Sequence, residues 1–560
     1  MKFKLLIFSL LLAINLPAQT GVQPDTIKDA GTLGASRPPT QRKKRFYKLP
    51  DAKPFAAEIK AADLKALLYV LTADSLQGRE TGQVGQQKAA QFIAEQFKAA
   101  GIPAKADRNS YFQQVLLRSD SWSEIGLTVD KQEFKNRSDF YVFPAFTADA
   151  PKVELKDVVF VGYGIEDAAY NDYEKTDVKG KAVIFYDGEP LKPDGKSLLT
   201  GNEFRSNWSV DWRKKVKLAK QKGATMVFII DPNFKESVKR NRKQISTYGW
   251  KPTGTQVSMA SGDLINCVFI STGVADAIFG EKSKKAAAEL GDLQNGEKFK
   301  ALKIKTKIEV RLDKTSKTLE GSNVLAVIEG SDSLLKKEYV MITAHYDHLG
   351  MPDSSVIYHG ADDNASGTSA VIEIARAFQT AKEKGVGPKR TVICMLVSGE
   401  EKGLLGSQYY TEFPLFPLDR TVADINIDMI GRVDERHAGN PDYVYVIGSD
   451  RISTELHDIS EMQNDENTKL ELDYKYNAKD DPNHYYERSD HYNFAEKGIP
   501  SIFYFNGTHP DYHRPTDTAD KINFDALAKR AQLAFNTAWE IANRPTRLQL
   551  DVPQEKKRDE

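Results

Sequence analysis

All nine histidines of this chain lie between residues 345 and 513, together with five short motifs rich in metal-binding residue types. The motifs are HYD at 345–347, GADDNASG at 360–367, SGEE at 398–401, NIDMIG at 426–431 and DYH at 511–513. Nitrogen and oxygen donors without thiolate suit zinc, cobalt or manganese, and mixed histidine and carboxylate sites most often hold zinc. This stretch therefore contains the ligand types of a hydrolytic site with two metal ions.

The carboxylates of these motifs can be given separate roles. A carboxylate has two oxygens and can bridge two metal ions about 3.5–4 Å apart, and we assign that bridge to Asp363. Glu400 and Glu401 follow the apolar run TVICMLV, where adjacent carboxylates repel each other unless a cation or a proton intervenes. We assign Glu401 as a metal ligand and Glu400 as the general base and acid. Asp428 ends another apolar run, where a metal ion would offset the cost of a buried charge.

Histidines complete the predicted ligand set. His345 directly follows the run YVMITA, and Asp347 is expected to orient its imidazole by accepting the second ring N–H. His513 lies in the segment HPDYHRPTDT, although His509 could serve equally well on chemistry alone. Two histidines and three carboxylates, one of them shared, would give each metal ion three protein ligands and an open position.

The elements that must position these residues alternate clearly after residue 338. Apolar runs of strand length (YVMITAH, TVICMLVS, VADINIDM, GIPSIFYF) are separated by longer amphipathic segments such as GTSAVIEIARAFQTAKEKG. This alternation predicts an α/β fold with a mainly parallel central sheet flanked by helices on both faces. The candidate ligands follow the strand ends, which is where open α/β sheets place their sites.

A chain of 560 residues exceeds what one hydrophobic core usually supports, so at least two domains are expected. Short β-branched runs between turn residues fill residues 125–315, with WRKKVKLAKQKGA as one helix-like segment. We interpret 125–315 as an inserted, mostly β domain. It divides the catalytic domain into a first part, 56–124, and a second part, 316–546.

The two ends of the chain differ from the rest in composition. Residues 1–18 combine two lysines, an apolar run and a Pro-Ala end, which predicts a cleavable signal peptide and a secreted or periplasmic protein. Residues 19–55 are expected to be a flexible leader, with folding beginning near Ile59, and residues 547–560 a charged tail. Lys plus Arg equals Asp plus Glu at 78 each, so no nucleic-acid partner is expected, nor any membrane association after signal cleavage.

Taken together, the motifs resemble the co-catalytic zinc aminopeptidases and carboxypeptidases, which include bacterial leucyl aminopeptidases and glutamate carboxypeptidase. The resemblance covers nearly all of the mature chain and implies a zinc peptidase fold, peptide substrates and two Zn²⁺ per chain. It implies that one zinc is held by His345, Asp363 and Asp428, and the other by Asp363, Glu401 and His513. It also places the catalytic base at Glu400. The inserted segment looks like a protease-associated domain, a lid-like module common in this family.

Further expectations concern the substrate. The resemblance gives Tyr512 the role of a hydrogen-bond donor to the tetrahedral intermediate, and the extra loop 349–360 is expected to shape the substrate pocket. An acidic cluster around Glu400 and Asp428 could hold a free N-terminal amine, which favours an aminopeptidase.

Two alternatives to an aminopeptidase stay open. A carboxypeptidase of the glutamate carboxypeptidase type would need a basic residue to hold a terminal carboxylate, and Arg432 and Arg488 are available. A catalytically silent peptide-binding protein should have lost a ligand or the base. No such residue is missing from this sequence.

Overall fold

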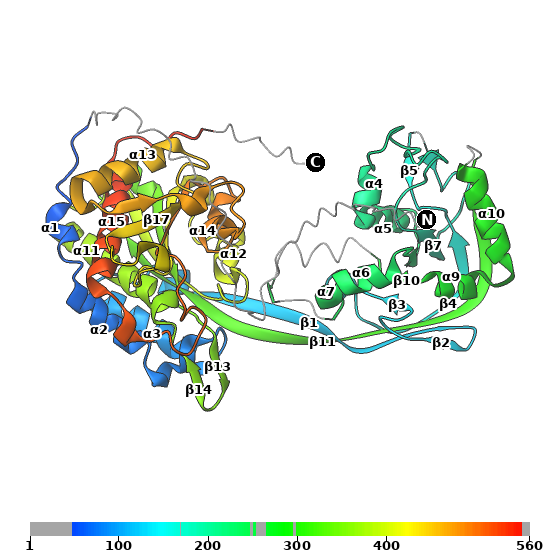
Figure 1. Cartoon of the computed structure of the whole chain (residues 1–560), viewed down its shortest axis with the longest axis horizontal. Coiled ribbons are helices and arrows are strands. Elements are labelled where there is room, and N and C mark those ends of the chain that lie inside the picture. Colours follow the sequence, from blue (N-terminus) through cyan, green and yellow to red (C-terminus); the bar gives the residue numbers. More distant parts are fainter. Residues whose placement is uncertain (1–46, 169, 247–249, 254–264, 295–297, 552–560) are drawn as a thin grey trace, which may run out of the picture.

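The computed structural model describes residues 47–168, 170–246, 250–253, 265–294 and 298–551. The expected signal peptide, the first part of the leader and the end of the charged tail lie outside these residues. The described chain forms two lobes joined by the long strands β1 (Phe112–Val129) and β11 (Leu302–Ile328) (Figure 1).

The lobe that carries the histidines is built on a mainly parallel sheet, as the sequence predicts. Four neighbouring strands run parallel in the order β19-β16-β12-β15. Their bounds are Ser501–Phe505 for β19, Thr421–Ile427 for β16, Tyr339–His345 for β12 and Thr391–Val397 for β15. The strand β11 pairs antiparallel with β15 at one side. At the other side β17 (Tyr443–Ile447) pairs antiparallel with β19, and β18 (Glu471–Asp473) follows parallel to β17.

Helices cover both faces of this sheet because its strands are apolar on both sides. In β12, Val340 and Ile342 belong to one hydrophobic cluster and Met341 to another, so successive residues face opposite cores. The first core is covered by α2 (Ala61–Leu71), α3 (Val84–Ala99), α11 (Gly367–Glu383), α13 (Thr454–Gln463) and α15 (Phe524–Asn543). The second is covered by α12 (Leu405–Glu412) and α14 (His491–Ala495).

Ordered packing begins earlier than the predicted start near Ile59. The short helix α1 (Lys53–Ala56) buries Phe55, whose ring stacks on Trp539 of α15 at 5.5 Å between centroids. The indole N–H of Trp539 donates to the carbonyl oxygen of Pro50 at 3.0 Å. The end of the expected flexible leader is therefore part of the lobe that carries the histidines, which is the predicted catalytic lobe.

The inserted lobe contains more helix than the sequence interpretation allowed. Its strands β4 (Ala150–Phe160), β7 (Ala182–Tyr186), β8 (Met226–Ile230) and β10 (Cys267–Ile270) are parallel, and parallel neighbours need crossover connections. Among the described residues these include α5 (Trp212–Gln221), α6 (Phe234–Arg240) and α7 (Arg242–Ser246). The helices α9 (Thr272–Phe279) and α10 (Ser283–Gln294) follow β10. The prediction of a single helix here was wrong.

Short elements complete this lobe. They are α4 (Asn207–Val210) and the strands β2 (Gln132–Phe134), β3 (Phe140–Tyr141), β5 (Glu166–Asp167) and β6 (Tyr170–Asn171). The strand β9 (Lys251–Pro252) instead pairs with β1 and contacts α12 of the other lobe. Buried side chains on the two faces of the sheet in the inserted lobe form two separate hydrophobic clusters. The lobe therefore has its own core on each side of the sheet.

The two lobes share one hydrogen-bonded sheet. The strands β1 and β11 pair antiparallel from Phe112 with Val324 to Val129 with Ile308, with a bulge between Trp122 and Glu124. At one end β11 pairs with β15 of the catalytic lobe, and at the other with β4 of the inserted lobe. The expected domain boundaries at 125 and 315 therefore fall inside continuous strands.

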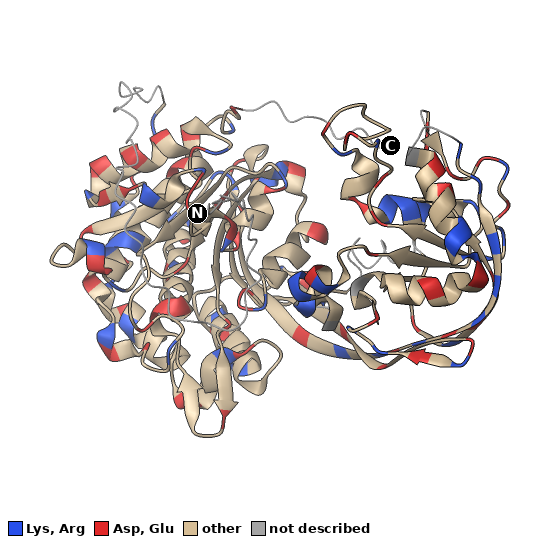
Figure 2. Cartoon of the chain, turned by 45° about the vertical axis from the view of Figure 1, so that its right-hand side comes forward, with Lys and Arg blue, Asp and Glu red and all other residues tan. Residues whose placement is uncertain are grey.

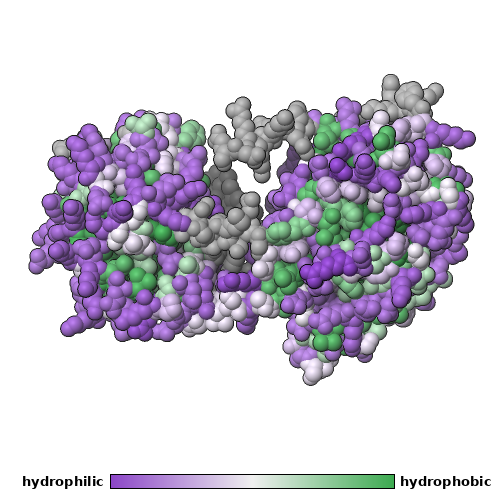
Figure 3. Space-filling view, turned by 180° about the vertical axis from the view of Figure 1, so that it is seen from behind, coloured by the Kyte–Doolittle hydropathy of each residue, from purple (hydrophilic) through white to green (hydrophobic). Residues whose placement is uncertain are grey.

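Charges of both signs are mixed over both lobes (Figure 2), in keeping with their equal totals. Viewed from behind, the surface is mostly hydrophilic with smaller hydrophobic patches on each lobe (Figure 3). Within the described part of the chain, no helix has both the length and the apolar character needed to cross a bilayer.

Candidate active site

The predicted ligands meet at the edge of the sheet where its four parallel strands end. His345 is the last residue of β12, Glu401 follows β15, and Asp428 follows β16 directly. His513 lies in the loop after β19, and Asp363 in the turn 361–366 that precedes α11. Because parallel strands end at the same edge, residues far apart in sequence become neighbours there.

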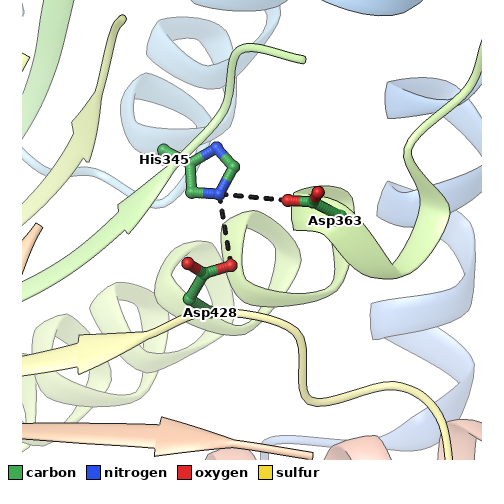
Figure 4. Close-up of side chains that lie close together, drawn as sticks. All are labelled: His345, Asp363 and Asp428. Atoms are coloured by element: carbon green, nitrogen blue, oxygen red, sulfur yellow. Dashed lines mark hydrogen bonds and ion pairs between the residues drawn. The ribbon is translucent and has the colours of Figure 1, made fainter. Parts of the chain in front are cut away.

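Three side chains form a first group of potential ligands (Figure 4). Nε2 of His345 lies 3.2 Å from Oδ1 of Asp363 and 3.2 Å from Oδ1 of Asp428. All three side chains are buried, and their donor atoms point toward one another. These three residues could hold one metal ion.

A second group is built around the other oxygen of Asp363. Nε2 of His513 lies 3.0 Å from Oδ2 of Asp363 and 3.3 Å from Oε2 of Glu401. Asp363 therefore presents Oδ1 to the first group and Oδ2 to the second, which is the arrangement that a bridging carboxylate requires.

The structure adds one histidine that the sequence interpretation missed and sets another aside. Nδ1 of His348 lies 2.8 Å from Oε1 of Glu401, inside the second group. The signal was present, since HYDH places His348 three residues after His345. His509, the alternative to His513, lies instead with Nε2 3.1 Å from Oδ2 of Asp362.

Asp347 has a different role from the one expected. Nδ1 of His345 faces the backbone carbonyl oxygen of Asp347 at 3.0 Å, whereas the carboxylate of Asp347 is 3.9 Å away. That carboxylate accepts hydrogen bonds from the hydroxyl of Thr81 at 2.7 Å and the backbone N–H of Glu400 at 3.2 Å. The turn after β12 thus brings the backbone carbonyl of Asp347 to the imidazole of His345. The side chain of Asp347 instead accepts a hydrogen bond from the backbone of Glu400.

Glu400 lies beside the ligand groups rather than within them. Its Oε2 is 3.9 Å from Nε2 of His345, and its side chain lines a pocket with Asp428 and Glu401. Burial, together with the neighbouring carboxylates of Glu401 and Asp428, raises the pKa of Glu400 well above its ordinary value. A carboxyl group with a raised pKa is suited to taking up and releasing a proton.

The electrostatics of the cluster fit a bound cation. Burial opposes protonation of His513, yet the carboxylates of Glu401 and Asp363 raise its pKa to about 11. Burial also opposes protonation of His345, yet the carboxylates of Asp428 and Glu400 raise its pKa. So much buried negative charge needs compensation, and the nitrogen and oxygen donors suit zinc.

Outer hydrogen bonds hold the carboxylates in place. Oδ2 of Asp428 accepts from the hydroxyl of Ser489 at 2.8 Å. Oδ2 of Asp517 accepts from the backbone N–H groups of Asp362 at 3.0 Å and Asp363 at 3.2 Å. Such partners orient ligands around a metal ion.

A pocket opens next to the four carboxylates. Its other lining residues are Met429, Tyr485, Arg488, Phe503, Phe505, Thr508, Tyr512 and His513. Nη2 of Arg488 donates to the hydroxyl of Tyr512 at 3.4 Å, and the Tyr512 ring stacks on His513 at 3.9 Å between centroids. Burial and the nearby Asp363 raise the pKa of Tyr512 well above its ordinary value, so its hydroxyl remains a donor.

The extra loop 349–360 is not among the residues that line this pocket. It forms a hairpin of β13 (Gly350–Asp353) and β14 (Val356–Tyr358) that contacts residues 74–79 and projects from the catalytic lobe (Figure 1). The expected role in shaping the pocket is therefore not seen in this conformation.

Comparison with known proteins gives a match for the part of the chain that carries this site. Residues 323–538 match the family model described as Peptidase family M28. The match covers less than half of the chain, and it is this segment that is similar to the family. Leucine aminopeptidase 1 of Sclerotinia sclerotiorum is 30% identical over 230 residues, covering 40% of this chain and 56% of that protein. Aminopeptidase YwaD of Bacillus subtilis is 27% identical over 245 residues, covering 42% of this chain and 47% of that protein.

The M28 segment contains every predicted ligand, and the match confirms the resemblance to aminopeptidases that the motifs indicated. This chain spans about half the length of the curated relatives it matches. Among solved structures, an aminopeptidase from Aneurinibacillus sp. strain AM-1 aligns over 90% of this chain and 98% of its own, with a TM-score of 0.43 and 19% identity. The assignment of each ligand to a particular metal ion stays a prediction.

Proposed function

We propose that this chain is a zinc-dependent exopeptidase that releases N-terminal residues from peptides and holds two zinc ions. The observation that carries the proposal is the sharing of Asp363. One of its oxygens lies 3.2 Å from His345 and the other 3.0 Å from His513, with Glu400 beside both groups. A shared carboxylate with an adjacent base is the arrangement that two-metal hydrolysis requires.

The protein groups around the site divide the work of peptide hydrolysis. Zinc ions held there would supply Lewis acidity and lower the pKa of a water molecule to about 7. Glu400 takes a proton from the attacking water and delivers it to the leaving amine. Tyr512 donates from its hydroxyl to the carbonyl oxygen as negative charge develops, and Arg488 adds a positive charge beside that hydroxyl.

The pocket walls favour an aminopeptidase with a preference for apolar side chains. Among its lining residues, Glu400 and Asp428 offer negative charge to a free N-terminal amine. Met429, Phe503 and Phe505 offer apolar and aromatic contact to the side chain of the first residue. The names of the curated relatives, leucine aminopeptidases among them, agree with this preference.

One observation favours carboxypeptidase activity as a second candidate. Arg488 lines the pocket and could hold a terminal carboxylate. Arg432, the other arginine considered, pairs with Asp511 at 2.9 Å and lies 3.7 Å from Asp517. Of these two arginines, only Arg488 is therefore placed to bind a terminal carboxylate.

Substrate panels decide between the two activities. Aminoacyl chromogenic substrates with leucine, phenylalanine, lysine and glutamate should be cleaved with the apolar pair fastest. N-blocked dipeptides with free C-termini should be cleaved at least 100-fold more slowly, and the opposite order would establish the carboxypeptidase.

Elemental analysis should give two zinc ions per chain, and activity lost on chelation should return with zinc. An active preparation with a metal content near zero would overturn the proposal.

The proposal also includes export of the protein from the cytoplasm, outside which it would act on peptide substrates. Residues 1–18 have the composition of a cleavable signal, and Ala18 is the expected last residue removed. N-terminal sequencing of the protein recovered outside the cytoplasm should begin at Gln19. Recovery of an uncleaved chain in the membrane fraction would contradict this part.

A further inference from the structure

His348 is buried at the second ligand group and has no part in the mechanism above. Its Nδ1 lies 2.8 Å from Oε1 of Glu401 and 3.8 Å from Oδ2 of Asp363. The side chain is fully buried. Its ring meets the ring of His513 edge to face, 5.9 Å between centroids. Both imidazoles therefore face the same pair of carboxylates.

The backbone around His348 is shaped to hold its ring in this place. The backbone N–H of His348 donates to the carbonyl oxygen of Arg79 at 3.2 Å. Gly360 has φ +54, and a Cβ added there would lie 2.5 Å from Cγ of His348. The ring therefore fits only because residue 360 is glycine. Among the described residues, Nε2 of His348 has no hydrogen-bond partner, so the polar contacts of the ring are all on the Nδ1 side.

Each of the two histidines of the second group contacts both of its carboxylates at about the spacing of ligands of a single ion. Around a tetrahedral zinc with bonds of about 2.0–2.1 Å, neighbouring donor atoms lie about 3.3 Å apart. His348 lies 2.8 Å from Oε1 of Glu401 and 3.8 Å from Oδ2 of Asp363. His513 lies 3.3 Å from the other oxygen of Glu401, Oε2, and 3.0 Å from the same Oδ2 of Asp363. These distances bracket the tetrahedral value on both sides. The first group has three donors, and Glu400 lies 3.9 Å from its histidine.

We propose that His348 is a fourth protein ligand, through Nδ1, of the metal ion held by Asp363, Glu401 and His513. The proposal rests on the two-metal site of the proposed function. It makes the two metal positions unequal. The ion at His345 and Asp428 keeps an open position for water or substrate, whereas the other ion has its tetrahedral positions filled by protein. The filled position should bind metal first and release it last.

Cobalt(II) titration of the full-length, metal-free protein tests this assignment, because the visible absorption of cobalt(II) reports its coordination geometry. In the wild type, the first equivalent should give the intense spectrum of a four-coordinate ion. In His348→Gln the first equivalent should bind at least 10-fold more weakly, with a weaker, higher-coordinate spectrum. His437→Gln is the matched control, since His437 is also buried and lies 2.8 Å from a carboxylate, that of Asp434, while its ring packs on Tyr443 and Tyr445 rather than on the ligand residues.

Affinity alone cannot decide the question, because losing an outer hydrogen-bond partner also lowers metal affinity by about 10–100-fold. The spectrum decides it. Weaker binding with an unchanged spectrum would show that His348 only donates a hydrogen bond to Glu401, and would overturn the proposal.

His348→Cys gives a positive test that does not depend on a loss. A thiolate at this position should restore tight binding and add a sulfur-to-cobalt charge-transfer band in the near ultraviolet. Absence of that band in a folded variant that still binds cobalt would contradict the proposal. If the wild type binds no metal at all, the proposed function fails instead, so the two failures are distinguishable.

Discussion

Exchanging one carboxylate for an amide within the Glu400–Glu401 pair separates the base from the ligand. Glu401 is 2.8 Å from His348 and 3.3 Å from His513, so Glu401→Gln removes a charged donor from the second group. Oε2 of Glu400 lies 3.9 Å from Nε2 of His345, farther than the 3.2 Å of the ligands Asp363 and Asp428, so Glu400→Gln should leave both metal positions intact. The two variants differ by one position in sequence, and each is the control for the other.

The expected magnitudes follow from these contacts. General acid–base help is worth about 10²–10⁴-fold, so kcat of Glu400→Gln should fall by that factor, or about 3–5 kcal/mol in the barrier. KM should change much less, because the amide keeps the shape of the side chain. Glu401→Gln should lose one zinc on dialysis and most of its activity, and added zinc should restore part of both.

The assay combines elemental analysis with steady-state kinetics on one leucyl substrate. Both variants should be compared at matched zinc activity, so that weak binding is not mistaken for slow chemistry. If Glu400→Gln keeps more than a tenth of the wild-type kcat, Glu400 is not the base. If Glu400→Gln loses zinc while Glu401→Gln keeps both ions, the roles within the pair are reversed.

Three further predictions concern the donor, the core and the inserted lobe. Tyr512→Phe keeps the stack on His513 but removes the hydroxyl, so kcat should fall about 10²–10³-fold at unchanged zinc content; an unchanged kcat would rule out the donor role. Burial raises the pKa of Glu373 from its ordinary 4.5 to about 7, so between these values the folded state binds the extra proton. The free energy of unfolding should therefore fall as pH rises through this window, by up to about 3 kcal/mol. Urea titrations of Glu373→Gln should lack that slope, and an identical slope would assign it to other groups. Because Trp122 and Lys314 are cross-strand partners, replacing residues 123–313 with Asn-Gly should close β1 and β11 into a hairpin. That protein should keep its zinc and accept long peptides more readily relative to short ones, whereas a metal-free aggregate would show that the inserted lobe completes the catalytic core.

The sequence predicted the catalytic sheet well because its signals are local. Runs such as TVICMLV identify buried strands, and polar residues directly after them fall at the shared edge. Asp363 could be proposed as the bridging carboxylate from local sequence alone, because a tight turn before it and a helix after it fix its position. Its two oxygens do point to different groups in the structure.

Contacts set by loop geometry could not be read in the same way. Whether the carbonyl or the carboxylate of Asp347 meets His345 depends on backbone dihedrals after β12, which leave no pattern in the sequence. His348 was missed for the same reason, since a loop has no periodicity to show which side chain turns inward.

Arg79 makes long-range contacts that no local sequence pattern predicts. Its guanidinium donates to the carbonyl oxygens of Tyr346 at 2.8 Å, His359 at 2.8 Å and Gly360 at 2.9 Å, more than 260 residues away in sequence. In the inserted lobe, by contrast, the apolar residues Val274, Ala275, Ile278 and Phe279 carried a helical spacing that could have been recognised.

The strand pair β1 and β11 has a consequence for how the chain is made. Phe112 pairs with Val324, so the partner of β1 leaves the ribosome about two hundred residues later. At roughly 5–20 residues per second, this delay lasts roughly 10–40 s. During that time α2 and α3 have been synthesised, but β11, which contacts α3, and the helices α11 and α15, which contact α2, do not yet exist. The apolar face of α2, with Leu64, Leu67, Leu68 and Leu71, stays exposed for the whole interval. Since α15 (Phe524–Asn543) also packs on α2, the nascent chain should be a strong client of chaperones that bind apolar helices until residue 543 has emerged.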